Sequence, residues 1–203
     1  MEFIKDAFEL LKRNKEYPYY QAERRIDIFF NLFLEEILNH FLESDTIKFL
    51  LPEFPLKKKN NNQSTKVDYI CYDDVKKVIY FVELKTDATS FNSDQLAIYQ
   101  EYNDWAKCLS EVQIISSNAS KEYKTKFQIA FEVLKQAKIF ELDSYNIPIM
   151  LIYIAPESVK INATFTELEK QNKAVLISFK KLSTFKSTKY PGEWELLKQN
   201  FLL

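Results

Sequence analysis

The sequence predicts an α/β fold with a mixed central sheet flanked by helices. Three features indicate this fold: apolar residues at helical spacing, a hairpin of two apolar strands between residues 66 and 85, and a strongly apolar run at 146–155 that is typical of a central buried strand. The 203 residues are 46% hydrophobic and 15% aromatic, which is enough for a packed core rich in Phe and Tyr. We expect one domain over residues 1–203.

Two predicted helices open the chain, and strands follow them. Pro18 separates the helices, in which apolar residues recur three and four positions apart. Pro52 and Pro55 cannot donate sheet hydrogen bonds, so their strand is expected at a sheet edge or beside a bulge. The polar stretch at 57–66 is expected to be a solvated loop, and a basic flap that meets phosphate is the alternative. The elements expected here are helices at 1–15 and 20–42 and strands at 47–56, 66–72 and 78–85.

The second half of the chain mixes helices with strands. Residues from Ser90 to Ser93 include candidate N-caps for a helix that follows the hairpin. Pro156 ends the apolar run at 146–155. The elements expected in this half are helices at 94–109, 121–138, 165–173 and 193–203 and strands at 112–115, 146–155 and 174–179.

Composition excludes several classes of site. A single Gly excludes Gly-rich phosphate loops, and the one His, His40, argues against histidine-rich metal sites and Ser-His catalysis. The two cysteines, the absence of a signal-peptide pattern and the lack of any apolar run near 18 residues lead us to expect a cytoplasmic protein with no membrane partner. The net charge of −1 means that any phosphate-binding face must come from a local basic cluster and a bound metal.

Charged residues at the ends of the hairpin strands form the candidate site. Asp68 lies near the start of the first strand, and Glu83 and Lys85, which share a strand face, lie near the end of the second. Ionised groups on a buried strand must be paired or bound to a cation. A small divalent cation takes one or two carboxylates, activates water and neutralises charge on a phosphate. The alternative is a surface Glu83–Lys85 ion pair on an edge hairpin.

An acid on the apolar face of the second predicted helix is a further candidate. At 100° per residue, Glu23 falls on the apolar stripe, near Phe30. The alternative is a first-turn Glu that the helix dipole favours. Glu36 and Asp27 are the other acids of this helix that we consider. Glu53 is a further acid whose direction the neighbouring prolines leave open.

This pattern resembles the PD-(D/E)XK nuclease superfamily, whose signature is an acid, often after Pro, followed one strand later by an acid-any-Lys triplet. Here Val67 stands where Pro is common, and Glu83-Leu84-Lys85 is the triplet. Gln95 and Tyr99, four apart on the next helix, resemble the Gln-x-x-x-Tyr pair of the RecB-like branch. The resemblance implies a restriction-endonuclease-like αβββαβ core over about 20–156, with extra helices and an added C-terminal strand and helix.

The resemblance implies a Mg²⁺- or Mn²⁺-dependent deoxyribonuclease. In that case Asp68, Glu83, the Leu84 carbonyl and Glu23 bind the metal, and Lys85 positions or activates water. Gln95 and Tyr99 then orient the site or the DNA backbone. The basic residues expected to contact nucleic acid are Lys57, Lys58, Lys59 and Lys66.

Several alternatives stay open. A catalytically inactive DNA-binding or assembly module of the same fold is the second reading, and a plain α/β interaction protein is the third. RNA is the alternative substrate, and a homodimer or a protein partner is the alternative assembly. The sequence does not separate exonuclease from endonuclease action, or DNA repair and recombination from defence against foreign DNA.

Overall fold

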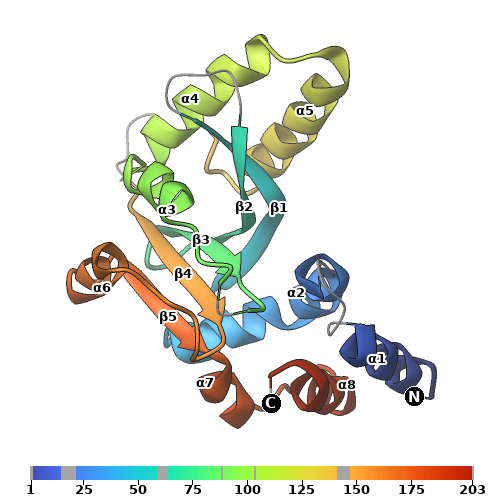
Figure 1. Cartoon of the computed structure of the whole chain (residues 1–203). Helices are drawn as coiled ribbons and strands as arrows, with labels where there is room; N and C mark the ends of the chain where they lie inside the picture. The colour runs from blue at the N-terminus through green and yellow to red at the C-terminus, as the bar shows by residue number, and fades with distance from the viewer. Residues whose placement is uncertain are drawn as a thin grey trace.

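A five-stranded mixed sheet forms the centre of the protein (Figure 1). The computed structural model describes residues 2–14, 22–58, 64–87, 89–102, 104–140 and 147–202. The strands lie side by side in chain order; the first two pairings are antiparallel and the last two parallel. The strands are β1 (Ile47–Lys57), β2 (Ser64–Asp73), β3 (Val78–Leu84), β4 (Ile149–Ala155) and β5 (Ala174–Ser178).

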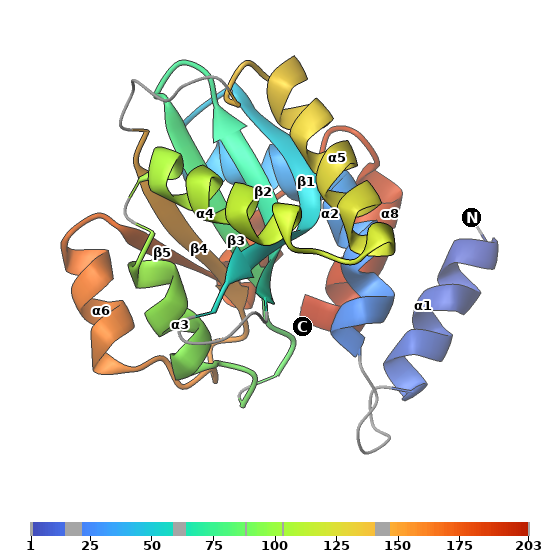
Figure 2. The ribbon, with the colours of Figure 1, turned by 90° about the horizontal axis from the view of Figure 1, so that it is seen from above.

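Helices cover both faces of the sheet (Figure 2). On one face Leu96, Trp105, Phe127 and Phe165 belong to the core formed with the sheet. The helices that bring these side chains are α3 (Ser93–Gln100), α4 (Trp105–Ser117), α5 (Lys121–Gln136) and α6 (Ala163–Lys170). The elements that form the core on the other face are α1 (Glu2–Asn14), α2 (Ala22–Phe41), α7 (Phe179–Thr184), α8 (Pro191–Leu197) and the π-helix η1 (Lys198–Leu202).

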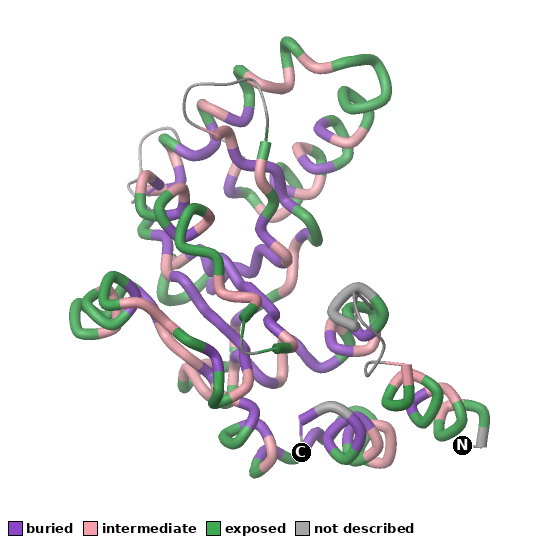
Figure 3. Tube along the Cα trace, in the orientation of Figure 1, coloured by how far each residue is buried: buried purple, intermediate pink, exposed green. Residues whose placement is uncertain are grey.

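The central strand β3 is buried on both faces (Figure 3). Its side chains alternate, so that Phe81 packs on the α3–α6 face while Val82 and Leu84 pack on the α2 face. By the same alternation Glu83 shares the face of Phe81. An acid therefore lies at the end of a strand whose other side chains are apolar, which requires local partners for its charge.

The α/β architecture and all five sheet strands agree with expectation. Pro52 and Pro55 lie in β1, which is an edge strand with a register shift between Phe49 and Leu51, as expected. The solvated loop expected at 57–66 is only partly described: Lys57 ends β1, Ser64 begins β2, and residues 59–63 lie outside the described part.

Two expectations for the second half were wrong. The helix expected at 94–109 is two helices, because the Asp104 side chain accepts a hydrogen bond from the Lys107 amide and begins α4. The strand expected at 112–115 is part of α4, where Val112 is buried beside Cys108 and Leu109 at helical spacing. The N-cap of α3 is Asn92, which lies within the expected stretch from Ser90 to Ser93. Helix α7 was not expected.

No helix among the described residues is long and apolar enough to cross a membrane.

Candidate active site

Asp68 and Glu83 meet where β2 and β3 pair. The antiparallel register aligns Tyr69 with Val82, so the next position along the ladder brings the two acids side by side. The Asp68 amide donates to Glu83 Oε1 at 3.4 Å, and Asp68 Oδ2 accepts from the Leu84 amide at 2.9 Å. The hairpin therefore places both carboxylates at one end of the sheet, as expected.

Glu83 and Lys85 form a buried ion pair. Lys85 Nζ lies 2.7 Å from Glu83 Oε2, and their side chains are 8% and 0% exposed, respectively. The surface ion pair considered as an alternative is thus excluded by burial. A buried pair is held by close geometry and further hydrogen bonds, because removing both charges from water costs several kcal/mol per ion.

Helix α3 supplies those further hydrogen bonds. Asn92 caps the helix by accepting from the amides of Asp94 and Gln95. Gln95 Nε2 then donates to Glu83 Oε1 at 3.2 Å, and the Tyr99 hydroxyl donates to the same oxygen. Their i,i+4 spacing puts both side chains on one helix face, so the pair expected from the sequence does face the site.

The same two side chains also hold the start of β2. The Lys66 carbonyl accepts from Gln95 Nε2 at 3.1 Å and from the Tyr99 hydroxyl at 3.0 Å. Asp68 lies two residues further along the strand. Helix α3 is therefore fastened both to Glu83 and to the backbone that carries Asp68, which fixes the relative positions of the two acids.

Burial and mutual repulsion act on both acids. Burial, followed by the negative charge of Asp68, raises the pKa of Glu83 to about 7, although the Lys85 charge opposes this rise. Burial also raises the pKa of Asp68 above its ordinary value, against the opposing charge of Lys85. Two adjacent carboxylates with raised pKa values gain from any cation that binds between or beside them.

A cavity of about 370 Å³ opens beside Asp68 and Leu84. Glu83 and Lys85 do not line this cavity. Three acids, from α2, β1 and β2, border the cavity together with one lysine. The lining residues are Asp27, Glu53, Ser64, Thr65, Lys66, Asp68, Tyr69 and Leu84.

The three candidate acids of α2 lie in different places relative to the cavity. The Glu23 side chain lies outside the described residues, although its backbone belongs to α2, one turn before Asp27. Asp27 lines the cavity, and its carbonyl accepts a hydrogen bond from the Tyr69 hydroxyl at 3.4 Å. Glu36 was a wrong alternative, because its carboxylate accepts hydrogen bonds from Ser187 and Thr188 on the C-terminal segment.

Basic residues gather at one rim of the cavity around Glu53. Glu53 Oε2 lies 2.7 Å from Lys66 Nζ and 3.3 Å from Lys126 Nζ. The Glu53 backbone has a φ of 48°, in the left-handed region that is uncommon for residues other than Gly. Of the other lysines expected to meet nucleic acid, Lys57 and Lys58 are half-buried, and Lys59 lies outside the described residues.

Two residues near the site were not expected from the sequence. Lys126 is on α5, far from Glu53 in the chain, and no sequence signal connects them. Tyr153 pairs with Glu83 across β3 and β4, and its buried hydroxyl has no hydrogen-bond partner in the described part of the chain. Only the alternation of β4 could have indicated that Tyr153 shares a face with Glu83, once the register was known.

The donor set fits a small divalent cation. Among the described side chains, no three His, Cys, Asp or Glu residues are grouped closely enough to enclose an ion alone. Mg²⁺ does not need such a cage, since it usually binds through one or two carboxylates and keeps several waters. Asp68 and Leu84 line the cavity, and burial raises the pKa of Asp68 although the Lys85 charge and the Leu84 amide oppose the rise.

No model of a known protein family, no curated protein and no solved structure matches this chain in sequence or fold.

Proposed function

We propose that the protein is a divalent-cation-dependent nuclease that hydrolyses phosphodiester bonds in DNA, with a PD-(D/E)XK-like site. One observation carries the proposal: Asp68, Glu83 and Lys85 converge at one end of the sheet, and Gln95 and Tyr99 from the following helix donate to Glu83. The element order α2, β1, β2, β3, α3, β4 supports a restriction-endonuclease-like core, with α4 and α5 inserted before β4.

Each residue has a distinct role in this proposal. Asp68, Glu83 and the Leu84 carbonyl would hold Mg²⁺ or Mn²⁺, with Glu23 or Asp27 closing the site from α2. The bound cation supplies charge neutralisation on the phosphate and lowers the pKa of water. Lys85 is held by Glu83 so that its ammonium group orients water and stabilises negative charge that develops on the phosphate.

Gln95 and Tyr99 are positioning residues. They restrict Glu83 to one rotamer and tie α3 to the Lys66 carbonyl. Because a misplacement of about 1 Å can cost about 100-fold in rate, this fastening is expected to matter for activity even if neither side chain touches the reacting atoms.

A cleavage assay with matched controls tests the proposal. We expect wild-type protein to cleave DNA in Mg²⁺ or Mn²⁺ but not in EDTA, and Lys85→Ala and Asp68→Asn to lose about 100-fold or more of the rate. The controls are Lys77→Ala and Asp74→Asn, which break an exposed ion pair of 2.7 Å at the other end of the same hairpin. Equal cleavage by the wild type and all four variants, or no cleavage by the wild type, would exclude the proposed nuclease activity.

A non-catalytic module of the same fold is the second candidate. It is favoured by the full set of protein donors around Glu83, which stabilise the acid without any ion. Calorimetric titration with Mg²⁺ and Mn²⁺ separates the two functions. A lack of heat from either ion, together with DNA binding, would support the module.

A further inference from the structure

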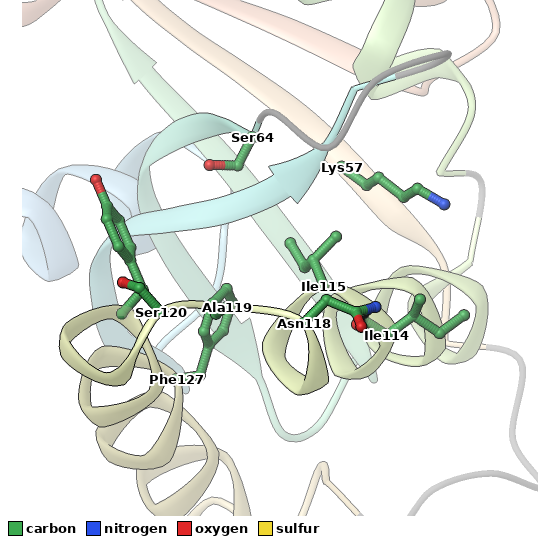
Figure 4. A pocket seen from close by; sticks show the side chains of 9 residues that line it. Lys57, Ser64, Ile114, Ile115, Asn118, Ala119, Ser120 and Phe127 are labelled. Carbon is green, nitrogen blue, oxygen red and sulfur yellow. Dashed lines mark hydrogen bonds between the residues drawn. The ribbon is translucent and has the colours of Figure 1, made fainter.

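A second cavity lies between the α4–α5 turn and the adjacent ends of β1 and β2 (Figure 4). Its volume is about 570 Å³, within the range of small-molecule sites. Lys57 and Ser64 border it from the sheet side, while Ile115, Asn118 and Phe127 border it from the helices. Helix α5 is additional to the αβββαβ core that the family resemblance implies, so one wall of this cavity belongs to the added part of the chain.

The chemistry of the cavity combines an apolar surface with polar groups. Ile115 and Ala119 contribute apolar surface, and Phe127, which is only 5% exposed, contributes an aromatic ring. Tyr123 and Ile114 also line the cavity and are 59% and 52% exposed, so both side chains are accessible to a ligand. Lys57, Ser64, Asn118 and Ser120 add polar groups. A flat, partly polar ring system is the ligand that such a lining suits.

The second cavity adjoins the acidic one. Ser64 lines both, at the start of β2 and four residues before Asp68. Lys126, three residues after Tyr123 on α5, meets Lys66 of the acidic cavity through the shared Glu53 carboxylate. Two lysines share one acid there, so this part of the rim of the acidic cavity carries a net positive charge that suits a phosphate.

We propose that this cavity binds the base of an unpaired nucleotide, while the backbone of the same strand passes Lys126 and Lys66 toward Asp68. The inference rests on the proposed nuclease function and specifies its substrate as single-stranded. Tyr123 supplies the stacking surface, because base–aromatic stacking tolerates any sequence. Lys126 supplies a phosphate contact.

Binding of a fluorescent ten-residue oligothymidine, followed by anisotropy in EDTA, tests the site without any cleavage. We expect Tyr123→Ala to weaken binding at least about fivefold. Tyr190→Ala is the matched control, because Tyr190 is also exposed, at 42%, but begins α8 on the other face of the sheet, and it should leave the affinity unchanged. Thermal melts verify that both variants remain folded at the assay temperature.

An oligonucleotide of the same length with abasic sites separates base from phosphate contacts. The wild type should bind it more weakly, and Tyr123→Ala should cause no further loss. Lys126→Gln should reduce the dependence of log affinity on log salt by about 0.7 for either oligonucleotide. Lys135→Gln, also on α5 but paired with Glu132, should not change it.

The outcomes separate this inference from the proposed function. No binding by wild type, equal affinity of wild type and Tyr123→Ala, or the same loss on the abasic strand would overturn the base site, whatever the cleavage assay gives. Binding that depends on Tyr123, in a protein that does not cleave DNA in Mg²⁺ or Mn²⁺, would support the base site and refute the nuclease.

Discussion

Removing Lys85 should destabilise the protein by an amount that grows with pH. Lys85 is the cation paired with Glu83, and its loss leaves a buried acid with neutral donors, among them Gln95 and Tyr99, beside the negative charge of Asp68. Breaking a buried pair in this way costs about 3–5 kcal/mol if the remaining charge stays ionised. Glu83 can avoid that cost by taking up a proton.

The pH dependence of this destabilisation follows from the pKa of Glu83. In the folded wild type this pKa is raised to about 7 from 4.5, so the folded state retains a proton that the unfolded state has lost, and stability falls as pH rises between these values. Above pH 7 the stability of the wild type no longer falls with pH, because Glu83 has lost its proton in the folded state as well. Without Lys85 the folded pKa is higher still, so the decline continues at about 1.4 kcal/mol per pH unit. Lys85→Met should therefore cost about 2 kcal/mol more at pH 8.5 than at pH 7.

Urea unfolding in EDTA measures this difference, with the buried Trp105 and Trp194 as fluorescence reporters. Lys77→Met, at the exposed pair with Asp74, is the matched control and should change stability by less than about 1 kcal/mol at every pH. The double variant Glu83→Gln/Lys85→Met should lose the extra pH dependence. A cost of Lys85→Met that is the same at pH 6, 7 and 8.5 would refute the assigned burial and pairing of Glu83.

Three further predictions concern cation binding, acid stability and backbone conformation. Mn²⁺ at about 100 times its Kd should add about 3 kcal/mol of stability, or about 5–10 °C in Tm for a chain of this length, and Asp68→Asn should abolish the shift in differential scanning fluorimetry. Burial raises the pKa of Asp73, but hydrogen bonds from Lys76, Ser44 and Thr46 outweigh it and lower the pKa below 3.8. Asp73→Ala should therefore cost about 1–3 kcal/mol at pH 7, and urea titrations should show this cost disappearing as pH falls through the folded pKa; a constant cost would contradict the network. Lys138 follows α5 with a φ of 58°, so Lys138→Gly should raise the free energy of unfolding by about 1 kcal/mol, whereas a loss of stability would contradict the left-handed conformation.

The strands could be predicted because their local pattern and their burial agree. β3 and β4 are apolar along their length, and both become interior strands of the sheet. Pro52 and Pro55 indicated an edge position or a bulge, because a missing amide donor is tolerated at such places in a sheet. The strand predicted at 112–115 was wrong. Its β-branched residues favour a strand locally, but burial of Val112 with Cys108 and Leu109 stabilises a helix.

The candidate site was predictable only where residues are close in sequence. Glu83 lies near the end of β3 and Lys85 directly follows the strand, and Gln95 and Tyr99 share a helix face, so spacing alone placed each pair. The positions of Asp27, Lys126 and Tyr153 depend on how α2, α5 and β4 pack against the hairpin. Such long-range packing leaves no periodic signal in the sequence.

Anomalous diffraction from a crystal soaked in Mn²⁺ tests the central claim most directly. We expect one strong peak at the edge of the acidic cavity where Asp68 meets Glu83, with the Asp68 carboxylate and the Leu84 carbonyl within about 2.5 Å and Glu83 as the second acid of the site. A crystal with ordered Asp68 and Glu83 side chains, but with no peak there or with Mn²⁺ bound only elsewhere, would contradict the account.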